Sequence, residues 1–212
     1  MVRDEPAGEA ESVADEGRRS SGGDRPRAAD RILDAARELF YREGIRAVGV
    51  DEIVARAGVT KPSLYRSFAS KDELAAAYMR AYDADFWRRF EAALASGPAD
   101  DPRGQLLAFL SSASERTQRP AYRGCGMTNA AVEYPDAGNP ARQVAQANKR
   151  ELRRRLTALA AAMGAREPET LGDGLLLLVE GAYASGQLFG EGGPARSLVA
   201  AADRLIAASL AD

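Results

Sequence analysis

The chain has 212 residues, of which 45% are hydrophobic and 28% charged, and its formal net charge is −2. It has one cysteine and no histidine, which excludes an internal disulfide framework, histidine acid–base chemistry and histidine metal sites. No stretch reaches the roughly 20 apolar residues of a membrane span, and Met1 to Arg27 lacks the apolar core of a signal peptide. We therefore expect a cytoplasmic protein that contacts no membrane and holds no metal or cofactor, whereas carboxylate-based catalysis is disfavoured but not excluded.

Residues 1–27 predict a disordered N-terminal arm, because they are rich in Glu, Asp, Arg, Gly and Ser and offer almost nothing to bury. The arm carries several arginines just ahead of the first predicted helix, and these could reach along DNA. A solvated tail without a partner is the favoured interpretation. The arginines concerned are Arg18, Arg19, Arg25 and Arg27.

Apolar residues at helical spacing from Ile32 to Phe40 predict a first helix, which a glycine ends. Two short helices follow over residues 50–57 and 60–68, with a glycine between them. Ser70, with a glutamate three residues later, has the pattern of a capping box and begins a long fourth helix.

The rest of the chain is also predicted to be helical. Prolines stand near the start of the last three segments, where a missing backbone N–H costs least. No alternating pattern typical of strands occurs, so the predicted fold class is all-α. The predicted segments are 106–110, 127–132, 140–163, 168–189 and 194–210.

The most informative segment runs from Val50 to Phe68 and predicts two short helices joined by a tight turn. The apolar residues of the segment are spaced to pack inward, and Thr60 is an N-cap for the second helix. Polar side chains are left on the outer face of that helix. A buried rear and a polar front are what a recognition helix needs in order to enter a major groove.

The chain around this segment, from about Arg27 to Met79, resembles the TetR family of transcriptional regulators. The resemblance implies a three-helix DNA-binding domain at residues 28–75, a helical ligand-binding and dimerisation domain at residues 76–212, and no catalytic activity. It rests on Ala57-Gly58-Val59-Thr60, Leu64-Tyr65, Phe68 and Ser70-Lys71-Asp72-Glu73-Leu74.

By the same resemblance, one face of the second short helix contacts DNA, and a lysine at the start of the fourth helix contacts a backbone phosphate. From the residues alone, the tyrosine could instead be a half-buried helix aromatic and the lysines could be solvated. The DNA-facing residues implied on the helix are Thr60, Lys61, Pro62, Ser63, Tyr65 and Arg66, and the residue implied for the phosphate contact is Lys71.

The chain departs from the family pattern just before the second helix. Hydroxyl residues are usual there, and one of them caps the helix and touches phosphate. Val48 and Gly49 stand at these positions instead. Because glycine caps a helix at small cost, we expect the helix to form but one phosphate contact to be missing.

The second domain is predicted to hold a ligand pocket. Aromatic residues recur every four positions along the fourth helix, and polar residues on other helices accompany them. Packing of these aromatics in an ordinary core is an equally good interpretation. The candidate ligand-binding residues are Tyr82, Phe86, Trp87, Phe90, Asn129, Glu133, Glu180, Tyr183 and Gln187.

Two single residues in this domain have open interpretations. Glu180 follows four leucines and a valine, so its carboxylate needs a partner. An arginine from the region between Lys149 and Arg155 is favoured as the partner over a cationic or hydrogen-bonding ligand. Cys125 is more simply a small packing residue than a redox sensor.

The two closing segments carry apolar stripes that predict a four-helix interface in a homodimer. Packing of both stripes within one chain is the alternative. The stripes are Leu175, Leu178, Val179, Ala182, Gly186 and Phe189, and Leu198, Val199, Ala202, Leu205 and Ile206.

These features together predict a homodimeric repressor that binds a palindromic double-stranded DNA operator and is released by an unidentified small-molecule effector. The long fourth helix is the expected hinge. A small helical enzyme using Asn129, Glu133 and Glu180, or a helical adaptor protein without DNA binding, are the competing hypotheses. No metal-ligand spacing, phosphate-binding loop or nucleophile–base pair supports the enzyme, and the adaptor does not account for the polar face of residues 60–66.

Overall fold

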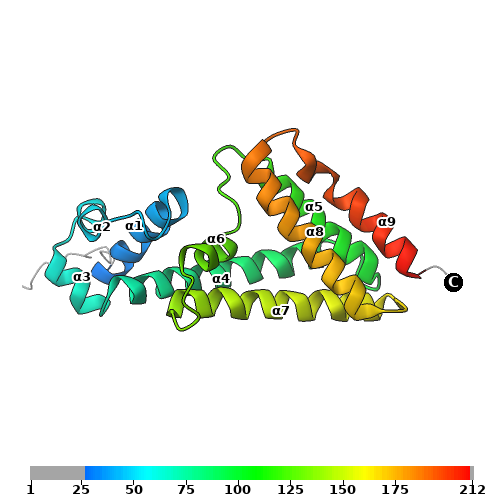
Figure 1. Cartoon of the computed structure of the whole chain (residues 1–212), viewed down its shortest axis with the longest axis horizontal. Helices are drawn as coiled ribbons and strands as arrows, with labels where there is room; N and C mark the ends of the chain where they lie inside the picture. The colour runs from blue at the N-terminus through cyan, green and yellow to red at the C-terminus, as the bar shows by residue number, and fades with distance from the viewer. Residues whose placement is uncertain (1–26, 211–212) are drawn as a thin grey trace, which may run out of the picture.

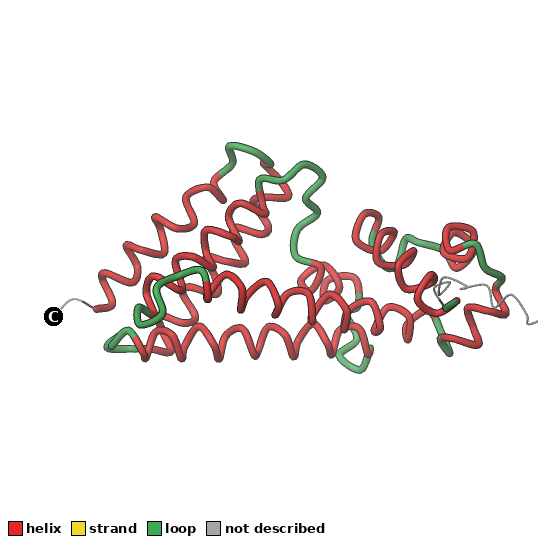
Figure 2. Tube along the Cα trace, turned by 180° about the vertical axis from the view of Figure 1, so that it is seen from behind, coloured by secondary structure: helices red, strands yellow, loops and turns green. Residues whose placement is uncertain are grey.

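The computed structural model describes residues 27–210, and every regular element in that range is a helix (Figure 2). The all-α prediction is therefore confirmed. The predicted arm, apart from Arg27, lies outside the described residues. The elements are α1 (Ala28–Glu43), α2 (Val50–Ala57), α3 (Lys61–Ser67), α4 (Lys71–Ala95), α5 (Pro102–Thr117), α6 (Gly126–Glu133), α7 (Pro140–Ala162), α8 (Pro168–Phe189), the 3₁₀ helix η1 (Pro194–Ser197) and α9 (Leu198–Leu210).

Helices α1, α2 and α3 form a unit at one end of the molecule (Figure 1). Ile32, Ile53 and Leu64 come from the three helices in turn, and all three are fully buried in its core. Gly58 ends α2 in the left-handed conformation, at φ 62° and ψ 41°, which glycine adopts without strain. The chain then turns directly into α3.

Helix α4 connects this unit to the rest of the molecule (Figure 1). The Ser70 hydroxyl caps it by accepting from the Glu73 N–H at 3.1 Å, as the sequence predicts. It packs on α1, where Tyr41 stacks on Tyr82 and Arg37 pairs with Asp85, and it also packs on α5 and α7. One continuous helix therefore reaches from the three-helix unit into the helical body.

The body consists of α4 to α9, with α7 packed along both α4 and α8. Two glycines of α8 allow close helix approach. A Cβ at Gly172 would meet the Thr157 backbone of α7 at 2.9 Å, and one at Gly186 would meet the Thr117 side chain of α5 at 2.4 Å. The small side chain predicted at Gly186 for a dimer contact therefore serves packing within the chain.

The last predicted helix is divided in two. Residues 194–197 form η1, in which the Arg196 N–H donates to the Gly193 carbonyl three residues earlier at 3.2 Å. Most residues of the two predicted dimer stripes are buried against the chain's own helices, including Leu175, Val179 and Ile206. Within residues 27–210, no helix combines the length and the apolar character that crossing a membrane requires.

Candidate nucleic-acid interface and ligand cavity

Helix α3 turns one apolar side chain inward and most of its polar ones outward. Leu64 is fully buried and fixes the helix against the core, whereas the next residue, Tyr65, is 51% exposed. Ser63 is half-buried. The remaining predicted contact residues of this segment are exposed, namely Thr60, Lys61, Pro62 and Arg66.

Hydrogen bonds order this outer face. The Thr60 side chain accepts from the Ser63 N–H as the N-cap, at 3.4 Å. The Ser63 hydroxyl accepts in turn from the Arg66 guanidinium at 2.9 Å. Lys61 forms an ion pair with Asp51 of α2 at 2.7 Å, which raises the pKa of its ammonium. Because this pair is exposed, it is weak and can exchange for a phosphate.

An arginine of α1 fixes the turn between α2 and α3. The Arg31 guanidinium donates to the Ala57 carbonyl at 3.0 and 2.7 Å, and it also donates to the Gly58 carbonyl. It thereby satisfies carbonyls that the end of α2 leaves without helical partners. Sequence reasoning missed this residue, because no local pattern connects it to a turn 26 positions away.

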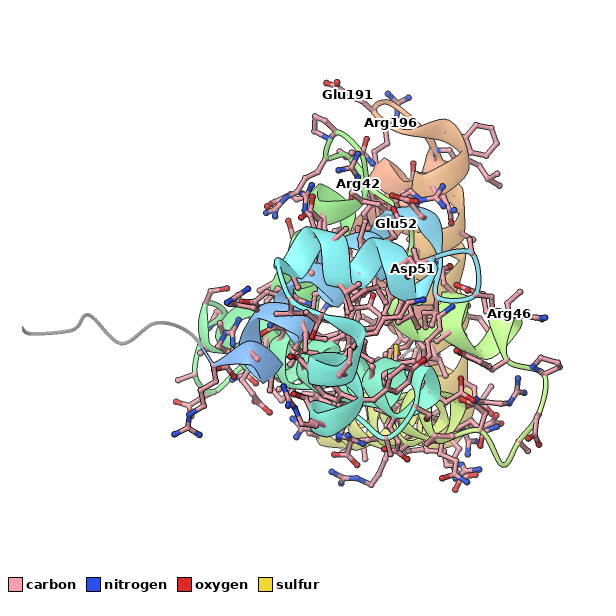
Figure 3. All side chains as sticks on the ribbon, turned by 90° about the vertical axis from the view of Figure 1, so that its left-hand side faces the viewer. Arg42, Arg46, Asp51, Glu52, Glu191 and Arg196 are labelled. Atoms are coloured by element: carbon pink, nitrogen blue, oxygen red, sulfur yellow. The ribbon has the colours of Figure 1, made fainter. Side chains whose placement is uncertain are left out.

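Lys71 lies where the three-helix unit meets the body. Its ammonium donates to the Arg46 carbonyl at 3.2 Å, and burial lowers its pKa. The Arg46 N–H donates to the Glu133 carboxylate at the end of α6, at 2.8 Å. Figure 3 looks onto this end of the molecule and shows Arg46 at its edge. Lys71 is thus held by the backbone that also contacts α6.

Helix α2 forms as expected despite the departure from the family pattern at its start. Gly49 is the N-cap residue, and no side chain caps the helix there. Val48 is buried and cannot reach a ligand. A Cβ added at Gly49 would meet nothing within 4 Å, so this position is open to solvent.

The body holds a small inner cavity between α4, α5 and α8, next to the start of α6. Its volume is about 20 Å³, enough for a water molecule but not for a larger ligand. The lining is mainly aromatic, with two arginines and a cysteine. The lining residues are Tyr82, Phe86, Arg89, Phe90, Phe109, Ser112, Ala113, Arg116, Tyr122, Cys125 and Tyr183.

A larger outer cleft of about 600 Å³ lies beside the inner cavity, between α1, α4 and the segment that follows α5. The cleft and the cavity share four lining residues, which therefore form the boundary between them. These boundary residues are Tyr82, Arg89, Arg116 and Tyr122. Burial raises the pKa of the Tyr82 and Tyr122 hydroxyls, so both are protonated at neutral pH.

Four predicted ligand residues line the inner cavity: Tyr82, Phe86, Phe90 and Tyr183. Trp87 lies behind it, where its ring packs on Phe86 and its indole N–H donates to Asp83 at 3.0 Å. The aromatic strip is therefore partly core and partly cavity lining.

The other predicted residues lie elsewhere. Glu133 contacts the three-helix unit, as described above. Asn129 donates to the Arg123 carbonyl at 2.7 Å, and Gln187 is exposed beside Gly124. The cavity residues that sequence reasoning missed include Arg89, Phe109, Arg116 and Tyr122.

Glu180 and Cys125 share a basic partner. The Lys149 ammonium lies 2.5 Å from the Glu180 carboxylate and 3.2 Å from the Cys125 sulfur. The partner of Glu180 thus comes from the predicted segment, but it is Lys149 and not the arginine that the sequence analysis expected. Glu180 lines a separate surface opening with Met127 and Leu176, and not the inner cavity.

Comparison with known proteins identifies the family. Residues 32–78 match the family model described as bacterial regulatory proteins, tetR family. The chain is also similar over most of its length to the crystal structure of SCO4454, a TetR-family transcriptional regulator from Streptomyces coelicolor. The two are 33% identical, with a TM-score of 0.80, over 87% of this chain and 97% of that one. The chain belongs to the TetR family.

This TetR-family chain also matches curated relatives over part of their length. It is 56% identical over 43 residues to the HTH-type transcriptional activator FasR of Mycolicibacterium smegmatis, covering 20% of each protein. It is 30% identical over 118 residues to the HTH-type transcriptional repressor ComR of Escherichia coli, covering 54% of this chain and 56% of ComR. The matched part therefore spans at most about half of these two relatives. Membership makes the chain a DNA-binding transcriptional regulator of a non-enzymatic family.

Proposed function

We propose that this TetR-family regulator acts in the cytoplasm as a homodimeric repressor, which leaves a palindromic operator when a small molecule enters its helical body. The observation that carries the proposal is the outer face of α3. An exposed Tyr65 and an ordered Ser63–Arg66 pair stand on a helix that the buried Leu64 holds in place. A helix of this kind can present side chains to base edges in a major groove.

An exposed apolar strip on α8 supports the homodimer. Leu177 and Leu188 are 72% and 78% exposed, and Phe189 is 63% exposed at the end of the helix. A shallow groove beside the strip is lined by residues of α8, η1 and α9, including Gly181 and Ala201. Large exposed apolar side chains next to small ones favour close contact with a second helix pair.

The contacts of α6 support release by a ligand. At its start, the Gly126 N–H donates to the Tyr82 hydroxyl at the boundary of the inner cavity, at 3.1 Å. At its end, Glu133 accepts from the Arg46 N–H at 2.8 Å. A ligand that displaces Tyr82 would shift α6, and α6 would shift the three-helix unit. For the ligand to weaken DNA binding, an element between the two sites must have two arrangements. Ligand binding must favour one arrangement, and DNA binding must favour the other.

Repression is favoured over activation by the extent of the similarity. The relative named as a repressor matches over 118 residues, whereas the one named as an activator matches over 43 residues. The longer match reaches well beyond the helix-turn-helix, so it includes part of the body that would carry the response.

The first experiment is fluorescence anisotropy of the chain with DNA from upstream of its own gene, at two salt concentrations. Tight, sequence-dependent binding that Tyr65→Ala abolishes is the expected result. Arg150→Ala, an exposed arginine of α7 far from α3, is the control and should bind like the original chain. Binding that is indifferent to sequence, followed by failure to select any site from a random library, would overturn the proposal.

The dimer is tested separately by light scattering after size-exclusion chromatography. Leu177→Glu should convert the dimer to a monomer, because it places a charge on the exposed strip of α8. Val132→Glu is the matched control, since Val132 is 78% exposed but lies on α6. A monomer for the original chain, or a dimer that survives Leu177→Glu, contradicts this interface.

A further inference from the structure

Two arginines at the boundary of the inner cavity have no acidic partner. Within residues 27–210, neither Arg89 of α4 nor Arg116 of α5 has a carboxylate oxygen within 4.0 Å of its guanidinium, and neither donates a hydrogen bond to another protein group. Some arginines of the body are paired, such as Arg103 with Asp203 at 2.7 Å and Arg153 with Asp173 at 2.5 Å. Others without an ion pair, such as Arg119 and Arg150, are exposed to solvent, whereas Arg89 and Arg116 are half-buried.

The nearest acid is already engaged. Asp85 lies one turn before Arg89 on α4, but it pairs with Arg37 at 2.5 Å and with Arg88 at 2.8 Å. Burial lowers the pKa of Arg89, and the positive charge of Arg116 lowers it further. Arginine side chains are nevertheless charged in proteins at physiological pH. The boundary therefore carries two positive charges that an anion would stabilise.

Two tyrosine hydroxyls next to these arginines also lack partners. Tyr122 and Tyr183 line the same cavity, and neither hydroxyl forms a hydrogen bond within the described part of the chain. Burial raises the pKa of both, so each is a hydrogen-bond donor. Because both hydroxyls line the cavity, a molecule or water bound there can accept hydrogen bonds from them. Four donors thus surround one small space.

The interior behind these donors is apolar. Phe86, Phe90 and Phe109 line the cavity, and the rings of Phe90 and Phe109 are 4.7 Å apart between centroids. Tyr82 and Tyr122 stand between this cavity and the outer cleft of about 600 Å³. That volume is within the range of about 300–1,000 Å³ typical of sites for small organic ligands.

We propose that the effector is an amphipathic anion, whose carboxylate binds Arg89 and Arg116 and whose apolar part displaces Tyr82 to enter the phenylalanine-lined cavity. This inference rests on the proposed function, since it names the ligand class of the same site. A guanidinium can bind a carboxylate through two parallel charge-assisted hydrogen bonds. A cationic ligand is disfavoured here, because Glu180 lies in another opening and is bound to Lys149.

The test uses 4-phenylbutanoate and decanoate, each compared with its uncharged amide. Calorimetry of the full chain gives the dissociation constants. The only tryptophan, Trp87, and the only cysteine, Cys125, add two readouts that do not depend on DNA. The acids should change Trp87 fluorescence and slow the alkylation of Cys125.

At least one of the acids should bind at least about ten-fold more tightly than its amide. A ten-fold difference in the dissociation constant corresponds to about 1.4 kcal/mol of binding free energy. Arg89→Met and Arg116→Met should each reduce acid binding to the level of the amide. Arg119→Met is the matched control, because Arg119 lines the outer cleft but not the inner cavity, and it should leave binding within about two-fold. Thermal unfolding of each variant separates lost binding from lost folding.

Equal binding of acid and amide overturns the ligand class, as does acid binding that survives both arginine variants, or no binding of either acid. None of these results concerns the binding of DNA. A separate anisotropy measurement asks whether the bound acid weakens the DNA complex. If the acid binds through the arginines and DNA affinity is unchanged, the ligand class stands and release by the ligand fails.

Discussion

The DNA-facing surface and the ligand cavity are built in opposite ways. The proposed DNA contacts come from one continuous segment, residues 60–71, with the exposed side of α3 opposite the buried Leu64. The cavity takes its lining from α4, α5, α8 and the residues before α6, from Tyr82 to Tyr183. A surface of the first kind follows from the local pattern, whereas a cavity of the second kind depends on how distant helices pack.

The charges of the two regions differ in the same way. Lys61 and Asp51 form an exposed pair that water screens, so it contributes little and can be exchanged for phosphate. Arg89 is half-buried beside another arginine, where charges interact more strongly than in water. We therefore expect substitutions in the first region to change salt dependence and those in the second to change ligand selectivity.

The largest effect should come from Leu64→Ala, which asks whether the two regions fold separately. Removing a fully buried leucine side chain costs about 2–5 kcal/mol of unfolding free energy. Circular dichroism should report an earlier loss of helix, while the fluorescence of Trp87 in the body shifts less. Leu156→Ala, equally buried on α7, is the control that should move the Trp87 signal. Equal shifts of both signals in Leu64→Ala would mean that the regions unfold as one unit.

A smaller effect is expected from Glu133→Ala, which breaks one contact between the regions. It should leave DNA affinity without ligand nearly unchanged, but reduce the weakening of DNA binding by the acids by about 1 kcal/mol, or roughly five-fold. Anisotropy with and without 4-phenylbutanoate or decanoate measures this coupling. Tyr134→Phe removes the neighbouring bond to Asp72 and should act in the same direction. Glu191→Ala, an exposed acid remote from α6, should have no effect.

The next expected effect is an increase in DNA affinity. Gly49→Ser adds a hydroxyl at the N-cap of α2, where a Cβ meets nothing within 4 Å. One added hydrogen bond to a phosphate should tighten DNA binding by about two- to ten-fold. Ala47→Ser supplies the same hydroxyl two residues earlier on an exposed position and should not tighten binding. No gain at Gly49 would mean that this helix end does not approach the DNA backbone.

The smallest expected effect is a change in how steeply DNA affinity falls with salt concentration. Lys61→Met should lower the salt dependence of DNA binding by about one unit in log–log slope, because one phosphate contact is lost. Lys71→Met should do the same once its ammonium leaves the Arg46 carbonyl. Arg150→Met, on α7, should leave the slope unchanged. An unchanged slope for both lysine variants would remove these residues from the phosphate contacts.

The sequence by itself determined the fold class, the helix-turn-helix and several helix ends. Helices at 50–57 and 168–189 begin and end where the pattern predicts. The reason is that glycines, prolines and capping hydroxyls act on their immediate neighbours, as Gly58 and Ser70 do. The inward and outward sides of α3 also follow from helical spacing alone, because three and four residues complete a turn.

Tertiary structure decided the rest. The aromatic strip of α4 is consistent with core or cavity until α5 and α8 are placed against it, and Arg89 and Arg116 are ordinary helix arginines until they meet at one boundary. Most residues of the predicted stripes of α8 and α9 pack inside the chain, whereas Phe189 of the predicted stripe remains exposed together with Leu177 and Leu188. The spacing of residues fixes which of them share a helix face, but only the packing of helices decides what that face contacts.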